Sequence, residues 1–323
     1  MIQKQKLLWA LIASVLASIQ SNAVSTIIEV FHSDTMNKNI NYRVVLPNTY
    51  SGRGTDPDKV FPVLYCLHGA GSSEEPWSVM SPLNSAIDGD YPAILVTFFA
   101  ENSWYIDTPG NSSSQYTTFF FDELVPFIES TYRAGGKPGL RAVTGFSMGG
   151  YGAWHYMLEK PDFFSSVSGL SGAFNRSPSN QTQWNPYTQI TEMATNSITL
   201  PPTYMNCGTA DGLISDNRNM KTHLTNNGYT TTLVETTGAG HDWPFWRDSS
   251  DEIIAFHYQY FSDAEAPAIW RGIELTGTSA ETATLGWLDV AQDPWSWSYS
   301  LENWVYLSPA YAPQTGGWAY LPK

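Results

Sequence analysis

Ser147 is the residue best suited to nucleophilic chemistry, because it stands at the centre of GFSMG, a glycine-x-serine-x-glycine pentapeptide that follows a short apolar run. A serine hydroxyl attacks a carbonyl carbon efficiently only when a base removes its proton. A sharp turn from a buried strand into a helix exposes such a hydroxyl, and the turn needs small residues two positions to either side. Gly145 and Gly149 meet that need. The pattern predicts a nucleophilic serine, provided that a base and an acid follow in the chain.

His241 is the candidate base and Asp211 is the candidate acid. His241 lies in the glycine-rich segment GAGHDWPFW after a predicted strand, and Asp211 lies in CGTADG, just past another predicted strand. A carboxylate in that position holds the imidazole in the required tautomer and stabilises its protonated form. Asp216, in the next predicted helix, is the alternative acid, although an aspartate in a first helical turn is more often a cap.

Other titratable side chains in the second half of the chain have simpler explanations. His223 and His257 lie in predicted helices, where we expect structural histidines. Asp242 adjoins His241 in the sequence and would point elsewhere, so we interpret it as structural.

An acyl-transfer site also needs hydrogen-bond donors for the oxyanion of its tetrahedral intermediate. The backbone N–H of Met148, directly after the candidate nucleophile, is one predicted donor. The second is predicted in the segment CLHGAGSS, where the N–H of Ala70 is the first choice and that of Gly69 the alternative. We expect His68, in the same segment, to brace the loop rather than to act as a base.

Four aromatic residues are predicted to lie in loops around the pocket. Flat aromatic walls suit an aryl acid or a sugar ring, and a packing role is the alternative for each residue. These candidate substrate-binding residues are Trp77, Trp104, Tyr105 and Trp243.

The elements that must position these residues alternate between strands and helices. Two antiparallel strands come first, at 26–33 and 41–47, and continuous apolar runs at 60–71 and 91–99 are typical of strands buried on both faces. The alternation predicts an α/β fold with a mostly parallel central sheet and helices on both faces. The further expected elements are helices at 117–133, 147–158, 213–224 and 250–261, strands at 140–146, 163–171 and 230–236, a strand with a turn at 203–212, and a loop inserted at 171–200.

The two cysteines, Cys66 and Cys207, fall on predicted strands. In a doubly wound sheet two strands would lie between them, which separates the cysteines by about 14 Å at the usual strand spacing. That distance exceeds the reach of a disulfide. We therefore expect two buried free thiols.

The net charge and the N-terminal sequence limit which partners and which cellular location we expect for the protein. The 323 residues carry a net charge of −14, which leaves no basic surface for nucleic acid. Residues 1–23 have the pattern of a signal peptide, with Lys4 and Lys6 before an apolar run and small residues up to Ala23, although a membrane anchor is the alternative. We expect cleavage near Ala23 and a secreted protein, periplasmic or extracellular, without a transmembrane segment.

Composition changes after residue 263. Residues 24–263 form the predicted catalytic domain, and residues 264–323 form a predicted small β appendage with six of the thirteen tryptophans. The pattern W-x-Y recurs at Trp297, Trp304 and Trp318, which places both aromatic residues on one face of a strand. Packing on the main domain, glycan or surface binding, and a sorting tail are the alternatives for this appendage.

The motifs resemble, in identity and order, those of the esterase D-like branch of the α/β hydrolases. The similarity covers residues 24–261 and rests on YCLHGAG, NSWYIDTP, FFFDELVPFIESTYR, AVTGFSMGGYGAW, CGTADG and GHDWPFW. This branch includes tributyrin-type acetylesterases, S-formylglutathione hydrolases, and the feruloyl and acetylxylan esterases of carbohydrate esterase family one.

The resemblance implies a serine carboxylesterase that uses no cofactor or metal. It places Ser147, Asp211 and His241 in the triad positions, and Ala70 and Met148 in the oxyanion positions. The expected substrates are acetyl or feruloyl esters on polysaccharides. The alternatives are an exported acyltransferase with the same triad and a glycan-binding protein with a vestigial hydrolase domain.

Overall fold

The computed structural model describes residues 24–51, 59–175 and 184–262, together with short strands between residues 269 and 320. The predicted signal peptide, residues 1–23, lies outside the described residues. No helix in the described ranges is long and apolar enough to cross a membrane.

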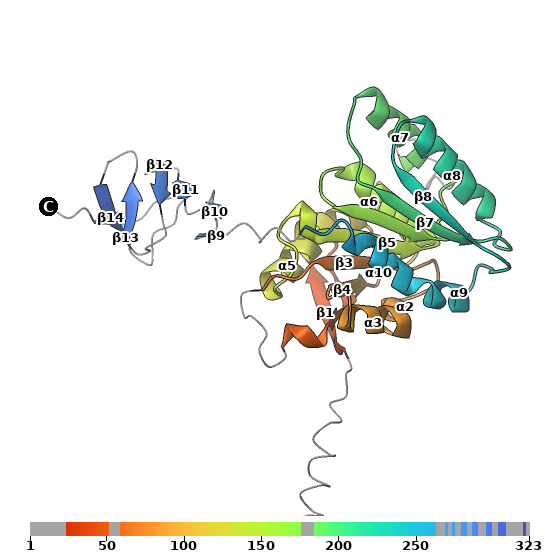
Figure 1. The fold of residues 1–323 in the computed structure, drawn as a ribbon, viewed down its shortest axis with the longest axis horizontal. Helices are drawn as coiled ribbons and strands as arrows, with labels where there is room; N and C mark the ends of the chain where they lie inside the picture. The colour runs from red at the N-terminus through yellow and green to blue at the C-terminus, as the bar shows by residue number, and fades with distance from the viewer. Residues whose placement is uncertain are drawn as a thin grey trace, which may run out of the picture.

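An eight-stranded sheet forms the centre of the molecule (Figure 1). Its strand order is β1-β2-β4-β3-β5-β6-β7-β8. β1 and β2 pair antiparallel, β2 pairs antiparallel with β4, and the remaining pairs are parallel. The strands are β1 (Ser25–Ser33), β2 (Lys38–Leu46), β3 (Val63–Leu67), β4 (Ile94–Phe98), β5 (Arg141–Phe146), β6 (Ser166–Leu170), β7 (Thr203–Gly208) and β8 (Thr231–Thr236). The predicted α/β fold with a mostly parallel sheet is confirmed.

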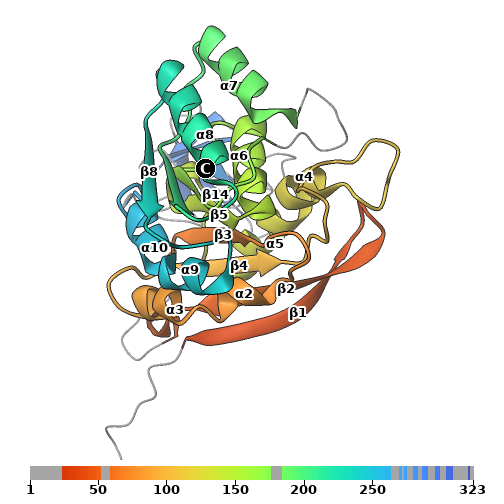
Figure 2. The ribbon, with the colours of Figure 1, turned by 90° about the vertical axis from the view of Figure 1, so that its right-hand side faces the viewer.

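Helices cover both faces of this sheet (Figure 2). One face packs on a π-helical turn (Phe119–Leu124) and on α4 (Tyr116–Thr118), α5 (Val125–Thr131), α6 (Met148–Glu159), α7 (Pro186–Thr195) and α8 (Ile214–Asn226). The other face packs on α2 (Glu75–Ser78), α3 (Ser81–Asp88), α9 (Trp243–Asp248) and α10 (Ser250–Tyr258). Short 3-10 turns at Asn48–Tyr50 and Pro138–Leu140 complete these elements.

The parallel strands are hydrophobic on both faces because both faces are covered. In β3, Tyr65 and Leu67 belong to the first apolar cluster, and Leu64 and Cys66 belong to the second. Since successive strand residues point to opposite faces, the unbroken apolar run of β3 serves two cores. Because β3 is packed on both faces, its C-terminal end has a fixed position, and so does the start of the loop that follows it.

The prediction for the cysteines is confirmed. Cys66 lies on β3 and Cys207 on β7, with β5 and β6 between them in the sheet. Both are buried free thiols. Burial raises the pKa of Cys207 to about 12, and burial also raises the pKa of Cys66 well above its ordinary value.

The prediction of one long loop over 171–200 is wrong in part, because α7 lies within it. The side chain of Asn185 caps this helix by accepting hydrogen bonds from the N–H groups of Tyr187 and Thr188, and Pro186 opens its first turn. The many polar residues of the segment concealed the buried Ile190. The Asn-Pro pair was the available signal for this helix start.

The described residues of the C-terminal part form seven short strands, most of which Figure 1 labels. β9 (Ile269–Trp270) and β10 (Ile273–Glu274) form a two-stranded sheet. A five-stranded antiparallel sheet contains β11 (Ser279–Thr282), β12 (Gly286–Asp289), β13 (Trp295–Ser298), β14 (Asn303–Leu307) and β15 (Ala319–Tyr320), in that order. The predicted β character of this segment is confirmed.

His257 on α10 is buried against β6, where its two ring nitrogens lie 2.8 Å from the hydroxyls of Ser166 and Ser168. Ser168 donates its own proton to Thr144, so the imidazole Nε2–H donates to Ser168 and Nδ1 accepts from Ser166. Burial lowers the pKa of His257 to about 3 and that of His155, buried on α6, to about 3 as well. Both rings are therefore neutral in the folded protein near pH 7.

We predict that the free energy of unfolding decreases as the pH falls from 6.5 towards 3, since the unfolded imidazoles bind protons in this window and the buried ones do not. His257→Asn removes one of these groups, so its stability should depend less steeply on pH. Thermal unfolding followed by circular dichroism between pH 7 and pH 4 measures this dependence. The matched control is His32→Asn at an exposed position, and an equal slope for His257→Asn and the wild type would contradict the prediction.

Candidate active site

Ser147 lies at a strained turn between β5 and α6. Its φ of 55° and ψ of −115° are unusual for a residue with a side chain. The turn is anchored to β6, because the N–H of Ser147 donates to the carbonyl of Leu170 and the carbonyl of Ser147 accepts from the N–H of Ala173. The hydroxyl is held at the carboxyl edge of the sheet, at the N-terminus of a twelve-residue helix.

The turn is possible only because glycines flank it. A Cβ on Gly145 would lie 2.2 Å from the backbone of Gly149, and a Cβ on Gly149 would lie 2.2 Å from the carbonyl oxygen of Leu67. Real Cβ atoms do not approach backbone so closely, so the two glycines let α6 pack directly on β5 and β3. This packing is the physical reason for the spacing found in the sequence.

The structure brings Ser147, His241 and Asp211 together. The Oγ of Ser147 lies 2.9 Å from Nε2 of His241, and Nδ1 of His241 lies 2.9 Å from Oδ2 of Asp211. Asp211 follows β7 and is 3% exposed, whereas His241 follows β8 and is open to solvent. Three side chains spread over 95 positions of the chain thus form one continuous hydrogen-bonded series.

Asp211 is held as a carboxylate. Burial is the largest single influence and opposes ionisation, but hydrogen bonds from His241, from Ser171 and from the N–H of Leu213, with the charge of His241, outweigh it and lower the pKa of Asp211. The Leu213 N–H lies 2.7 Å from Oδ1. An ionised Asp211 orients His241 with Nδ1–H towards itself and leaves Nε2 to accept the Ser147 proton.

The other acids have separate roles. Asp216, the alternative acid, lies in α8 and accepts a hydrogen bond from the side chain of Asn175 at 2.8 Å. Asp242 caps α9 by accepting from the N–H of Phe245, as expected for a structural residue. Asp211 is therefore the carboxylate that meets His241.

The two predicted oxyanion donors come from different segments of the chain, and their role stays a prediction. Ala70 is exposed in the loop between β3 and α2, and Gly69 is buried. Met148 is the first residue of α6. His68 braces the loop as expected: its Nε2 accepts from the Ala100 N–H at 2.8 Å, so its Nδ1–H donates to the Gly69 carbonyl at 2.7 Å. Burial lowers the pKa of His68, which keeps this ring neutral.

The prediction that four aromatic residues line the pocket is wrong for two of them. Trp77 is fully buried and donates its Nε1–H to the carbonyl of Leu67 at 2.9 Å. Tyr105 is fully buried and donates its hydroxyl proton to the carbonyl of His68 at 2.9 Å. Both side chains support the β3 loop from within, so neither contacts a substrate in this conformation.

Trp104 and Trp243 are half-buried, and their role in substrate binding stays a prediction. Trp104 packs edge-on against Tyr151 and lines a hollow of about 480 Å³. Asn102 also lines this hollow and accepts a hydrogen bond from the Gly71 N–H, so the hollow adjoins the loop that carries Ala70. The remaining lining residues are Glu101, Ser103, Ile106, Thr108, Asn111 and Ser114.

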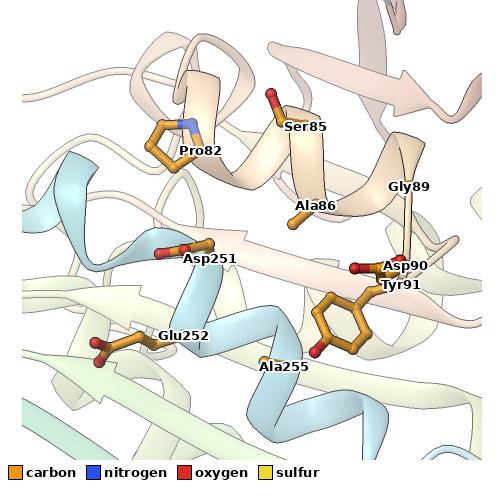
Figure 3. Close-up of a pocket in the computed structure, with 9 residues that line it drawn as sticks. All are labelled: Pro82, Ser85, Ala86, Gly89, Asp90, Tyr91, Asp251, Glu252 and Ala255. Atoms are coloured by element: carbon orange, nitrogen blue, oxygen red, sulfur yellow. The ribbon is translucent and has the colours of Figure 1, made fainter.

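A second hollow of about 490 Å³ lies between α3 and α10 (Figure 3). Its lining includes three carboxylates, from Asp90, Asp251 and Glu252, and the ring of Tyr91. None of the residues that meet at Ser147 lines it. The candidate active site therefore lies at the strand ends, and this hollow is not part of it.

Sequence reasoning missed Ser171 and Trp246. Trp246 lies in the same GHDWPFW segment as Trp243, one helical turn further on, and its ring packs against His241 with centroids 4.9 Å apart. Ser171 directly follows β6, the strand next to that of the nucleophile. Its position after a buried strand was the available signal.

Comparison with known families shows which family the chain belongs to. The model of a family described as putative esterase matches residues 33–257, well over half of the chain. The chain belongs to this family. The esterase is also 25% identical over 268 residues to an acetyl esterase of Caldicellulosiruptor saccharolyticus, a span that covers 72% of this chain and 96% of that relative.

Two further similarities agree with this assignment. An endo-1,4-beta-xylanase/feruloyl esterase of Xylanibacter ruminicola is 29% identical over 150 residues, which cover 44% of this chain and 21% of that relative. The esterase thus spans about a fifth of the larger protein's length. A solved ferulic acid esterase matches with a TM-score of 0.65 and 25% identity, and the match covers 74% of this chain and 100% of the other.

These findings confirm the resemblance to esterase D-like proteins. The fold is that of the α/β hydrolases, and the protein is a carboxylic-ester hydrolase.

Gly149→Ala should lower the free energy of unfolding by at least about 2 kcal/mol, because the new methyl group overlaps backbone that cannot move without displacing β3. Denaturant unfolding measures the change. Gly212→Ala is the matched control, since a Cβ there meets nothing within 4 Å, and its effect should stay within about 1 kcal/mol. Equal stabilities for the two variants would contradict the packing account.

Proposed function

We propose that this esterase cleaves its substrates through an acyl-enzyme on Ser147. The observation that carries the proposal is the series Asp211–His241–Ser147, with 2.9 Å at each of its two junctions. It places a base within hydrogen-bond reach of the nucleophile and an acid behind the base, which is the geometry that this chemistry needs.

In the first half-reaction, Nε2 of His241 takes the proton from Ser147 as Oγ attacks the ester carbonyl carbon. The resulting oxyanion accepts hydrogen bonds from the N–H groups of Ala70 and Met148. The bond to the alcohol oxygen then breaks, His241 returns its proton to that oxygen, and the acyl group remains on Ser147. In the second half-reaction, a water molecule gives its proton to His241 and attacks the acyl carbon. Collapse releases the acid, and His241 returns the proton to Ser147.

The proposed substrates are acetyl or feruloyl esters on polysaccharides. Support comes from the names of the relatives, an acetyl esterase, a ferulic acid esterase and a xylanase/feruloyl esterase. Support also comes from the polar hollow beside Trp104, since hydroxyl-rich ligands need hydrogen-bonding groups together with a flat apolar surface. Secretion after cleavage near Ala23 is the corresponding proposal for location, supported by the pattern of residues 1–23.

Ser147→Ala should lower kcat/KM for p-nitrophenyl acetate by about three to six orders of magnitude, because the acyl-enzyme cannot form. Its thermal unfolding should match that of the wild type. Ser130→Ala, at an exposed position on α5, is the control and should keep full activity. Wild-type hydrolysis by a purified Ser147→Ala protein would overturn the proposal.

A screen over acetylated xylan, methyl ferulate and short p-nitrophenyl esters tests the substrate class. We expect kcat/KM to be higher for an acyl group carried by xylan than for the same acyl group on methanol. Equal values for both alcohols would contradict a polysaccharide substrate. The same assay with added sugars separates hydrolysis from acyl transfer, because a transferase would form new sugar esters in preference to free acid.

The C-terminal strands favour glycan binding as a second function. Trp297 pairs with Trp304, Trp295 pairs with Tyr306, and Tyr306 pairs with Tyr320. Directly paired residues of antiparallel strands share a face, as do residues two apart on one strand. These five aromatic positions therefore fall on one face of the five-stranded sheet. A row of tryptophan and tyrosine positions on one face is a pattern that suits binding to the apolar faces of sugar rings.

Sedimentation of the full-length protein with insoluble xylan or cellulose tests this second function. The double variant Trp297→Ala/Trp304→Ala should lose binding and keep its activity on p-nitrophenyl acetate. Ser296→Ala/Val305→Ala, a pair on the opposite face, is the control and should still bind. Failure of the wild type to sediment with any polysaccharide, or equal loss in both double variants, would exclude a glycan-binding face.

A further inference from the structure

The loop that follows β3 lies directly against the turn that carries Ser147. A Cβ on Gly149 would lie 2.8 Å from the carbonyl oxygen of His68. A Cβ on Gly69 would lie 2.9 Å from the ring of Phe146, the residue before the nucleophile. The start of the β3 loop is therefore packed on the nucleophile turn, and the orientation of its backbone matters for the chemistry of Ser147.

Ala70 is exposed in this loop, and its N–H donates to no protein acceptor in the described part of the chain. An N–H that binds an oxyanion must keep one direction before the substrate arrives, because a preorganised donor stabilises the transition state without reorganisation. An exposed loop residue does not have such a fixed direction by itself. The direction of this N–H must therefore be fixed through the peptide groups on the two sides of Ala70.

The peptide group between Gly69 and Ala70 is held by its carbonyl. The Gly69 carbonyl accepts from Nδ1–H of His68 at 2.7 Å and from the N–H of Ser72 at 3.2 Å. The His68 ring is fully buried, and its Nε2 accepts from the Ala100 N–H at 2.8 Å, so the ring cannot turn without losing both bonds. In a trans peptide the N–H points opposite to the carbonyl. The Ala70 N–H therefore points away from the buried ring.

The peptide group between Ala70 and Gly71 is held by its N–H. The Gly71 N–H donates to Oδ1 of Asn102 at 2.7 Å. Asn102 is exposed, follows β4, and opens the NSWYIDTP motif, where no role has yet been assigned to it. Gly71 itself has a φ of 72°, which glycine adopts easily. Because the peptide groups on both sides of Ala70 are held, its φ and ψ angles are fixed although the residue is exposed.

We propose that Asn102 is a positioning residue of this esterase, which acts with His68 to keep the Ala70 N–H directed at the oxyanion. When the Asn102 acceptor is lost, the peptide group between Ala70 and Gly71 can rotate, and the Ala70 N–H loses its fixed direction. This inference rests on the proposed function, because it needs an oxyanion that Ala70 binds.

Asn102→Ala tests the inference with p-nitrophenyl acetate, which has no sugar part that could contact the hollow beside Trp104. Its kcat should fall by about tenfold with KM unchanged, because both half-reactions pass through an oxyanion and substrate binding does not. Its melting temperature should stay close to that of the wild type, since the side chain is exposed. Asn39→Ala is the matched control and should keep full kcat, because Asn39 is also exposed and its Oδ1 accepts a hydrogen bond from His32.

Asn102→Asp is the conservative variant, because a carboxylate oxygen can still accept from the Gly71 N–H. Its added charge would disfavour an oxyanion nearby, so the assay is run in about 1 M NaCl, where charges are screened within about 3 Å. Under these conditions its kcat should stay within about threefold of the wild-type value. A role of Asn102 as a hydrogen-bond donor to the substrate would not survive this substitution.

Inhibition by trifluoroacetone reports on the oxyanion directly. Oγ of Ser147 adds to the ketone carbon, the hydroxyl proton passes to His241, and the ketone oxygen becomes the oxyanion of a hemiketal. The inhibition constant should rise in Asn102→Ala by the same factor, about tenfold, by which kcat/KM falls. It should stay at the wild-type value in Asn39→Ala.

Wild-type kcat in Asn102→Ala, a change confined to KM, or an unchanged inhibition constant would overturn the inference. Equal losses of kcat in Asn102→Ala and Asn102→Asp would overturn it as well. Those outcomes would leave the proposed function standing as long as Ser147→Ala is inactive. An active Ser147→Ala protein would remove the proposed function itself, so the two failures are distinguishable.

Discussion

The hydrogen bond between Ser147 and His241 depends on the placement of strand ends. Ser147 follows β5, Asp211 follows β7 and His241 follows β8, and all these strands run parallel in one sheet. Their carboxyl ends therefore meet at one edge. β6 separates β5 from β7 in the sheet. A change in strand order would break the series, whichever residues stood at the strand ends.

Ser147 and Ser171 are two of the strained residues that follow strands at this edge. Ser147 and Ser171 follow neighbouring strands, and both have positive φ values, 55° and 50°. Each is tied to the next strand, because Ser147 donates to the carbonyl of Leu170 and Ser171 donates to the carbonyl of Asn206. The sheet, packed on both faces, holds these conformations against their intrinsic cost. The same rigidity keeps the hydroxyl of Ser147 and the carboxylate of Asp211 in fixed positions while His241 remains open to solvent.

Local chemistry made much of the fold and site predictable. Gly145 and Gly149 indicated a tight turn, and the structure shows that neither position has room for a Cβ. Apolar runs indicated strands buried on both faces, which β3 and β4 are. The loop position of His241, after a predicted strand, sufficed to place it near the strand that carries Ser147.

The wrong predictions concern residues whose role depends on whether the side chain is buried, which the sequence pattern alone does not reveal. Trp77 and Tyr105 lie in the predicted segments, but each turns its polar group inward to a backbone carbonyl of the β3 loop. The helix α7 was missed because its buried residues are only Pro186 and Ile190, among polar neighbours. Trp246 was missed because the choice between two tryptophans of one segment depends on the helix phase relative to His241.

Reaction with diethyl p-nitrophenyl phosphate, followed by peptide mass spectrometry, tests the central claim most directly. An activated Ser147 attacks phosphorus, releases p-nitrophenol and retains the diethylphosphoryl group. The account predicts one group per chain, on Ser147, and much slower labelling when His241 is replaced by alanine. Labelling of another residue, or equally fast labelling of the His241→Ala protein, would contradict the claim that His241 activates Ser147.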